Sequence, residues 1–269
     1  MQCEQTGSTV RNPKERNMEE YYQINAEGWA VRCKLYANEE HNIKKLVLFG
    51  HGLGGHKDNR AAEAFAKGIL KKNDGVATVT FNWPCHGDDG RKILRLNDCG
   101  RYLEILLEDI RERFGSPELY GYGNSFGAYL FLKFMSEHGD PFVKTALRSP
   151  TVNMYEVLRS AIMTESDCKR IWDGGTVQVG FDRKIEIDGI LLDSLREADI
   201  VQRDFSSFAD RILILHGTED EIVPFEAAKG FAEKNGIRFI PVEGGDHRLL
   251  NPGGMEFAVK MMLSHFGFE

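Results

Sequence analysis

A serine lies between two glycines in the segment Gly123-Asn124-Ser125-Phe126-Gly127. The residues before it have the apolar pattern of a β-strand, and those after it have the pattern of a helix, with no loop between. Glycines have no Cβ, so the chain can turn sharply there and hold the serine exposed. The pattern predicts a nucleophile at Ser125. The alternative is a plain glycine turn whose serine caps the helix.

A serine becomes a nucleophile when a base removes its proton and an acid orients that base. Two later loops hold groups of these types: Asp220 follows a predicted strand at 211–216, and His247 follows one at 239–242. Ser125 also follows a predicted strand. Since the carboxyl ends of parallel strands share one edge of a sheet, the three side chains are expected to meet there. We predict a triad of Ser125, His247 and Asp220.

Other acids and histidines compete for these roles, namely Glu219, Glu221, Asp246, His216 and His265. Acidic loop residues beside Asp220 are usually just solvated, and adjacency in sequence to the base gives Asp246 poor geometry as its acid. We expect His216 to be a buried turn residue, whereas His265 falls on the last predicted helix.

A third loop, Gly50-His51-Gly52-Leu53-Gly54-Gly55, follows a predicted strand at 45–50. The tetrahedral intermediate of acyl transfer carries an oxyanion, which two backbone N–H groups must stabilise. By position, the predicted donors are Leu53 and Phe126, the residue after the nucleophile. We expect His51 to brace the loop through a hydrogen bond. A phosphate-binding loop is excluded, because the GxxxxGK[ST] pattern is absent.

Strands and helices alternate along the chain, which predicts parallel βαβ units and a mostly parallel, doubly wound sheet. A hairpin at 21–25 and 29–36, turning at Glu27-Gly28, precedes them. The further strands are predicted at 45–50, 76–81, 118–122, 144–148, 211–216 and 239–242. Helices are predicted at 59–72, 97–114, 126–136, 225–234 and 253–266.

Residues 151–208 interrupt this alternation, because the stretch is too long for a simple connection. Helical patterns at 155–163 and 189–198 flank a predicted hairpin, with strands at 176–181 and 184–187 and a turn at Asp182-Arg183. We predict an inserted cap at 151–208 over a core of 21–150 and 209–269. Residues 1–20 form a polar N-terminal segment.

The composition excludes several classes of protein. The 34 Lys and Arg residues against 41 Asp and Glu residues give a net charge of −7, which argues against nucleic acid as the main partner. No apolar run approaches the roughly 20 residues of a membrane span, and no secretory signal is visible.

The five cysteines are odd in number, widely spaced and free of CxxC, so free thiols in the cytoplasm are expected.

Four loops in this order, HGLGG, GNSFG, HGTEDEIVP and GGDH, resemble those of the α/β-hydrolase superfamily. His216, Gly217, Asp220, Val223 and Pro224 match the HGxxDxxVP pattern that carries the acid in this family. The resemblance extends from about Tyr21 to the end of the chain. The short cap is similar to the cinnamoyl and feruloyl esterase-like branch and to the serine aminopeptidase-like branch. In the stretch 81–88, Cys85 replaces a usual Gly and Asp88 a usual Ser.

The resemblance implies an α/β-hydrolase fold and a serine hydrolase, a carboxylesterase acting on a small or medium soluble ester without metal or organic cofactor. Peptidase, thioesterase or acyltransferase activity on the same triad remains open, because fold does not determine substrate. A non-catalytic ligand-binding homologue is the alternative from a different class. Trp172 and Phe181 are candidates to stack on an aromatic acyl group, although aromatic residues are more often core. The expected partner is the ester alone, with no nucleic acid and no membrane.

Overall fold

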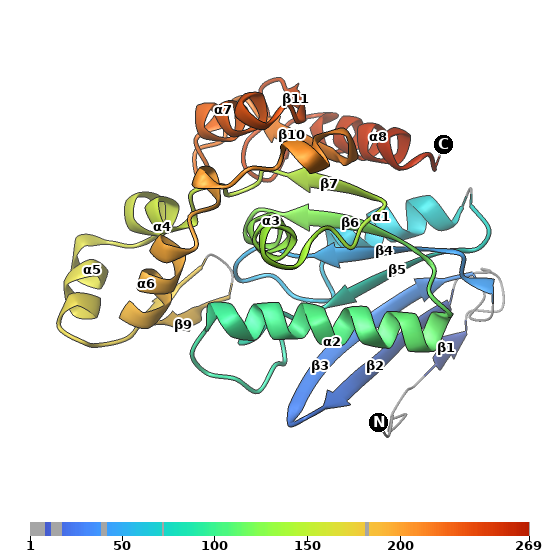
Figure 1. Cartoon of the computed structure of the whole chain (residues 1–269), viewed down its shortest axis with the longest axis horizontal. Coiled ribbons are helices and arrows are strands. Elements are labelled where there is room, and N and C mark those ends of the chain that lie inside the picture. The colour runs from blue at the N-terminus through green and yellow to red at the C-terminus, as the bar shows by residue number, and fades with distance from the viewer. Residues whose placement is uncertain (1–8, 12–17, 39–41, 72, 181–182, 269) are drawn as a thin grey trace.

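The computed structural model describes residues 9–11, 18–38, 42–71, 73–180 and 183–268 (Figure 1). Its main strands are β1 Thr9–Arg11, β2 Met18–Ala26, β3 Trp29–Ala37, β4 Lys45–Gly50, β5 Val76–Phe81, β6 Glu118–Asn124, β7 Lys144–Arg148, β10 Ile212–Gly217 and β11 Arg238–Val242. Within the described residues these form one sheet in the order β1-β2-β3-β5-β4-β6-β7-β10-β11.

The sheet is parallel from β5 to β11, while β1, β2 and β3 pair antiparallel with their neighbours. The turn between β2 and β3 has positive φ at Glu27 and Gly28, which fits the right-handed twist of a hairpin. The predicted mostly parallel sheet with an N-terminal antiparallel hairpin is therefore confirmed. β1 and the start of β2 fall in the segment predicted as polar N-terminal, where Thr9 pairs with Glu20.

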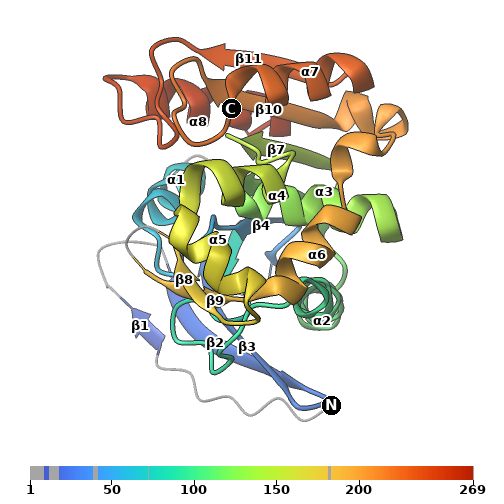
Figure 2. The same ribbon diagram turned by 90° about the vertical axis from the view of Figure 1, so that its left-hand side faces the viewer.

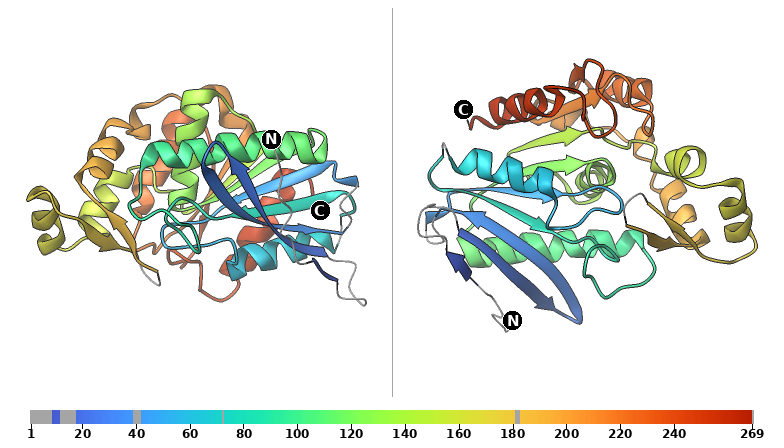
Figure 3. Two further views of the ribbon diagram at one scale, coloured as in Figure 1. Left: turned by 90° about the horizontal axis from the view of Figure 1, so that it is seen from below. Right: turned by 180° about the vertical axis from the view of Figure 1, so that it is seen from behind.

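Helices cover both faces of the sheet. The first helices in the chain are α1 Arg60–Leu70, α2 Leu96–Phe114 and α3 Phe126–His138, and the last are α7 Phe225–Asn235 and α8 Gly254–Phe266. α1 and α8 pack on one face, as the view from behind shows (Figure 3). α2, α3 and α7 pack on the other face.

α1 illustrates why these segments become helices. The side chain of Asn59 accepts hydrogen bonds from the N–H groups of Ala61 and Ala62, which caps the first turn. Phe65 and Ile69 lie on the buried face, at the spacing that the sequence predicts.

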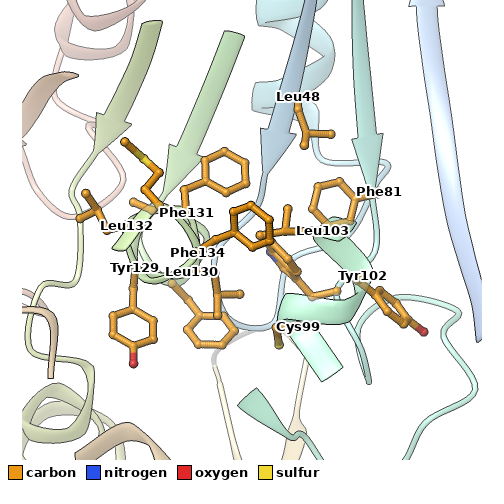
Figure 4. Packing of buried hydrophobic residues seen from close by; sticks show 14 of the residues in the cluster. Leu48, Phe81, Cys99, Tyr102, Leu103, Tyr129, Leu130, Phe131, Leu132 and Phe134 are labelled. Atoms are coloured by element: carbon orange, nitrogen blue, oxygen red, sulfur yellow. The ribbon is translucent and has the colours of Figure 1, made fainter. Parts of the chain in front are cut away.

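The core beneath α3 is dense and aromatic. Figure 4 shows Phe131 of α3 and Leu103 of α2 packed with Phe81 and Leu48, which belong to β5 and β4. All four side chains are buried. This packing fixes α3, and with it the turn at which the helix begins, against the ends of the strands.

Between the end of β7 at Arg148 and the start of β10 at Ile212 the chain leaves the sheet, and we call this stretch the inserted segment. It contains α4 Met154–Val157, a π-helical turn at Leu158–Ile162, α5 Glu165–Trp172, the antiparallel strands β8 Val177–Val179 and β9 Ile185–Ile187, and α6 Gly189–Glu197; the 3-10 turns Ile200–Gln202 and Ser206–Arg211 lead into β10. Figures 1 and 2 show these elements beyond the carboxyl ends of the parallel strands.

The hairpin predicted in the inserted segment corresponds to β8 and β9, although Asp182 of its predicted turn lies outside the described residues. The prediction missed α5. Its signal was a capping box, in which the side chain of Thr164 accepts from the N–H of Asp167 and the carboxylate of Asp167 accepts from the N–H of Thr164.

Candidate active site

Ser125 occupies the turn between β6 and α3 with φ 52° and ψ −114°, a backbone conformation that residues with a Cβ rarely adopt. The turn leaves no room for side chains on either side. A Cβ on Gly123 would lie 2.7 Å from the Cα of Ala128, and one on Gly127 would collide with the carbonyl oxygen of Gly50. Gly123 therefore lets the start of α3 fold back against β6, and Gly127 lets α3 approach the end of β4 closely.

His247 and Asp220 come from the loops after β11 and β10 and complete a chain of hydrogen bonds with Ser125. His247 Nε2 lies 3.0 Å from Ser125 Oγ, and His247 Nδ1 lies 2.8 Å from Asp220 Oδ2. Because the carboxylate accepts from Nδ1–H, Nε2 is free to accept the serine proton. The structure thus brings together the three side chains that the sequence singled out, in the geometry of a nucleophile, a base and an orienting acid.

Asp220 is held as a carboxylate although its side chain is fully buried. Oδ1 accepts hydrogen bonds from the N–H groups of Ile222 and Val223, at 2.9 and 2.8 Å. Burial alone would raise the pKa of Asp220, but the hydrogen bonds from His216 and His247 outweigh it and hold the pKa well below its usual range. A charged acid can stabilise the imidazolium that forms when His247 takes a proton.

His216 is a contact of the acid that the sequence reasoning missed. It is buried at the end of β10, and its Nε2 lies 3.1 Å from Asp220 Oδ2 and 3.0 Å from the carbonyl oxygen of Val223. The expected burial is confirmed, but His216 belongs to a strand and not to the turn. The signal was its place four residues before the acid in HGTED.

The loop after β4 is braced from below by His51, as expected. His51 is fully buried; its Nδ1 donates to the carbonyl oxygen of Gly52 at 2.8 Å, and its Nε2 accepts from the N–H of Trp83 at 3.3 Å. The indole N–H of Trp83 also donates to the carbonyl oxygen of His51. Burial lowers the pKa of His51 well below its usual value, so the ring is neutral and keeps this pattern of donor and acceptor.

The loop after β4 comes close to the turn that holds Ser125, since a Cβ on Gly52 would lie 3.3 Å from the Cβ of Ser125. Leu53 is the next residue and lines the same cavity as Ser125. Phe126 is the first residue of α3, so its N–H is one of those that a helix leaves without an internal partner. The oxyanion role of the Leu53 and Phe126 N–H groups stays a prediction.

A cavity of about 590 Å³ opens above Ser125 and His247, within the size typical of small-molecule sites. Its lining comes from the loop after β4, the start of α1, the ends of β6 and β7, the inserted segment and the loop that carries His247. Apolar side chains in the lining include Leu53, Met154, Val157, Ile162 and Leu250. The arrangement suits acyl transfer to a serine inside a partly apolar pocket.

The sequence model of the alpha/beta hydrolase family matches residues 46–254, which include all the loops just described. The chain belongs to the alpha/beta hydrolase family. The match spans more than half of the chain and runs through both the sheet and the inserted segment.

Solved structures resemble this alpha/beta hydrolase over nearly its whole length. Est1E from Butyrivibrio proteoclasticus, solved with ferulic acid bound, is 20% identical, with a TM-score of 0.72 over 91% of this chain and 99% of that one. The esterase domain of a Rhodothermus marinus protein is 16% identical, with a TM-score of 0.66 over 91% and 96%. A cold-adapted esterase from an Arctic intertidal metagenomic library is 17% identical, with a TM-score of 0.61 over 98% and 99%. No curated protein sequence matches the chain significantly.

Trp172, one of the two aromatic residues predicted to contact substrate, does not line the cavity above Ser125. The side chain of Trp172 is 89% exposed at the end of α5 and lines a separate hollow with Tyr155 and Leu192. The aromatic prediction for Trp172 therefore does not fit, because α5 carries it away from Ser125. Phe181 lies outside the described residues.

Two residues at the site carry no sequence motif. Thr151 is buried, and its Oγ1 lies 3.4 Å from Ser125 Oγ. Arg148, the last residue of β7, lines the cavity, and its carbonyl oxygen accepts the N–H of Ser125 at 3.0 Å. Both reach Ser125 because β7 lies beside β6 in the sheet, a neighbourhood that the sequence does not state.

The described part of this hydrolase holds no group of three or more His, Cys, Asp or Glu side chains placed to bind a metal ion. Among the same residues, no helix combines the length and the hydropathy needed to cross a bilayer.

Proposed function

We propose that this alpha/beta hydrolase cleaves a carboxylic ester of a small or medium substrate through an acyl-enzyme on Ser125. The observation that carries the proposal is the continuous chain of hydrogen bonds from Ser125 Oγ through His247 to Asp220, at 3.0 and 2.8 Å. The fold shared with two esterases supports the choice of ester over other acyl substrates.

In this mechanism Ser125 Oγ attacks the acyl carbonyl carbon while His247 Nε2 takes the hydroxyl proton. The oxyanion of the tetrahedral intermediate is bound by the N–H groups of Leu53 and Phe126. His247 then gives the proton to the leaving alcohol, which departs and leaves an ester on Ser125. Water attacks that ester by the same steps, and the acid and free enzyme are released.

The test is hydrolysis of a small panel: p-nitrophenyl esters from acetyl to octanoyl, methyl ferulate, an acyl thioester and an aminoacyl nitroanilide. We expect turnover of the esters and a loss of at least about 10⁴-fold in kcat for Ser125→Ala. Thioester or anilide turnover alone would indicate a thioesterase or a peptidase.

A fluorophosphonate probe supplies a readout that does not depend on the chosen substrates. We expect it to label the wild-type protein and not Ser125→Ala. Absence of both labelling and turnover would contradict the proposal and favour a protein that binds ligands without catalysis.

A further inference from the structure

The cavity above Ser125 has a one-sided charge. Arg60, Arg148 and Arg248 are among its lining residues, while no Asp or Glu of the described chain lines it. Glu256 contributes to the neighbouring groove between α1 and α8 and not to this cavity. The whole chain has a net charge of −7, so the positive lining is opposite to the average of the protein. A cavity lined by one sign of charge attracts ligands of the opposite sign.

Arg148 is the unusual member of this lining, because it is only 5% exposed. A guanidinium group stays charged at any pH that a protein tolerates, so burial cannot neutralise it. A buried charge is costly unless it is paired and hydrogen-bonded. Arg148 therefore needs a compensating partner.

The protein provides little of that compensation. Of the five N–H donors of a guanidinium group, the Arg148 side chain uses Nη1 to donate to the carbonyl oxygen of Arg248 at 3.1 Å. Its Nε is buried without an acceptor. In the described part of the chain Arg148 forms no ion pair.

Other cationic side chains of the same chain that are buried or partly buried do pair with a carboxylate. The Lys34 side chain is 5% exposed and lies 2.8 Å from a carboxylate oxygen of Glu19. Arg113, partly buried, likewise lies 2.7 Å from a carboxylate oxygen of Glu20. Arg148, which lies beside the turn that holds Ser125, has no such carboxylate. This indicates that the counter-ion of Arg148 is a group of the ligand.

We propose that Arg148 binds a carboxylate group of the substrate, so that the preferred esters are themselves acids. This inference rests on the proposed ester hydrolysis and adds the charge of the substrate. The guanidinium fork matches a carboxylate through two parallel N–H···O bonds. Apolar lining residues such as Leu53 and Val157 contact the carbon chain between the carboxylate and the ester.

The first test uses the wild-type protein and two pairs of esters matched in size. Monomethyl adipate and methyl heptanoate differ by a carboxylate on the acyl side. 4-Acetoxybenzoate and 4-acetoxybenzamide differ by a carboxylate on the alcohol side. We expect kcat/KM to be at least about 10-fold higher for the acid of one pair, since a charged hydrogen-bonded contact contributes about that much or more. Equal values within both pairs would overturn the inference while ester turnover still upheld the proposed function.

The second test asks whether the preference depends on Arg148. We expect Arg148→Met to have the same kcat/KM for the acid and the neutral ester, and Arg148→Lys to keep part of the preference for the acid. Arg196→Met, on the exposed face of α6, is the matched control and should keep the whole ratio. A preference that survives in a folded Arg148→Met protein would contradict the role of Arg148. If Arg148→Met does not fold, the ratio in Arg148→Lys is compared with that in the wild type, and an unreduced ratio in Arg148→Lys would contradict the role of Arg148.

A binding measurement separates this inference from the proposed function. By calorimetry, Ser125→Ala should bind the acid of the preferred pair at least about 10-fold more tightly than its neutral partner, and the added change Arg148→Met should remove this difference. Binding without any ester turnover or probe labelling would uphold the anion site and refute the esterase. Turnover of neutral esters without carboxylate binding would uphold the esterase and refute the anion site.

Discussion

His216 Nε2 lies 3.1 Å from Asp220 Oδ2, the same oxygen that accepts from His247 Nδ1 at 2.8 Å. Two histidines thus share one carboxylate oxygen, one from β10 and one from the loop after β11. Both contacts favour the charged form of Asp220, and only His247 also contacts Ser125. In the proposed mechanism, His216 is therefore a positioning residue that acts on His247 through Asp220.

Removing this contact should weaken catalysis. In His216→Leu the carboxylate of Asp220 loses one hydrogen-bond donor, so Asp220 is held less firmly in the position from which it orients His247. We expect kcat to fall about 10-fold with KM nearly unchanged, the size of effect that loss of one hydrogen bond to a charged group produces.

His216→Gln is the control for this prediction, because its amide N–H can donate in place of Nε2. The kcat of this variant should return toward that of the wild type. An unchanged kcat in a folded His216→Leu protein would show that His216 serves packing alone.

The close approach of α3 to β4 predicts that Gly127 does not tolerate a methyl group. A Cβ there would collide with the carbonyl oxygen of Gly50, which is backbone and cannot rotate away. We expect Gly127→Ala to lower the free energy of unfolding by about 3 kcal/mol, as overpacking does. Urea denaturation measures this change.

Gly68, within α1, is the matched position because a Cβ there meets no atom within 4 Å. Gly68→Ala should raise the free energy of unfolding by about 0.5–1 kcal/mol, since alanine is the better helix former. Equal effects at Gly127 and Gly68 would mean that α3 does not approach β4 as closely as described.

Asp109 should make stability fall as the pH rises. It is 6% exposed on α2, and burial raises its pKa to about 6, although Arg113 opposes the rise. The unfolded carboxyl titrates near 3.9. Between these values the folded state binds more protons than the unfolded state, so the contribution of this group to stability is lost from about pH 4 to above pH 6.

The measurement is the free energy of unfolding of wild type and Asp109→Asn at pH 4 and pH 8. The variant should be more stable at pH 8 by about 2 kcal/mol and similar at pH 4. Glu108→Gln, an exposed change on the same helix, should give no such pH-dependent difference. A constant difference between wild type and Asp109→Asn would contradict the burial of a charge at this position.

The inserted segment should depend on one bidentate ion pair for its attachment to α2. Arg95 Nη1 and Nη2 donate to Asp188 Oδ1 and Oδ2 at 2.9 and 2.7 Å, and Asp188 also caps α6. We expect Arg95→Ala to speed amide hydrogen exchange in α6 by roughly 10-fold, since a partly buried pair with good geometry contributes about 1–2 kcal/mol.

Arg196 pairs with Asp193 on the exposed side of α6 and supplies the control. Arg196→Ala should leave the exchange of α6 nearly unchanged, because exposed pairs contribute little. Equal acceleration in both variants would show that the inserted segment is held by other contacts.

The sequence by itself determined most of the elements and singled out Ser125, Asp220 and His247. Helical and strand periodicity located α1, α3 and β10 to within a few residues, because one buried face repeats along each element. The glycines around Ser125 and the loops with Asp220 and His247 were readable because local turn chemistry constrains them.

Only the tertiary structure decided which other side chains reach the site. Arg148 and Thr151 approach Ser125 because β7 lies beside β6 in the sheet. Trp172 points away because of the course of the inserted segment. Periodicity reports which face of an element is buried, but strand order and the direction of an insertion arise from contacts between residues distant in the sequence.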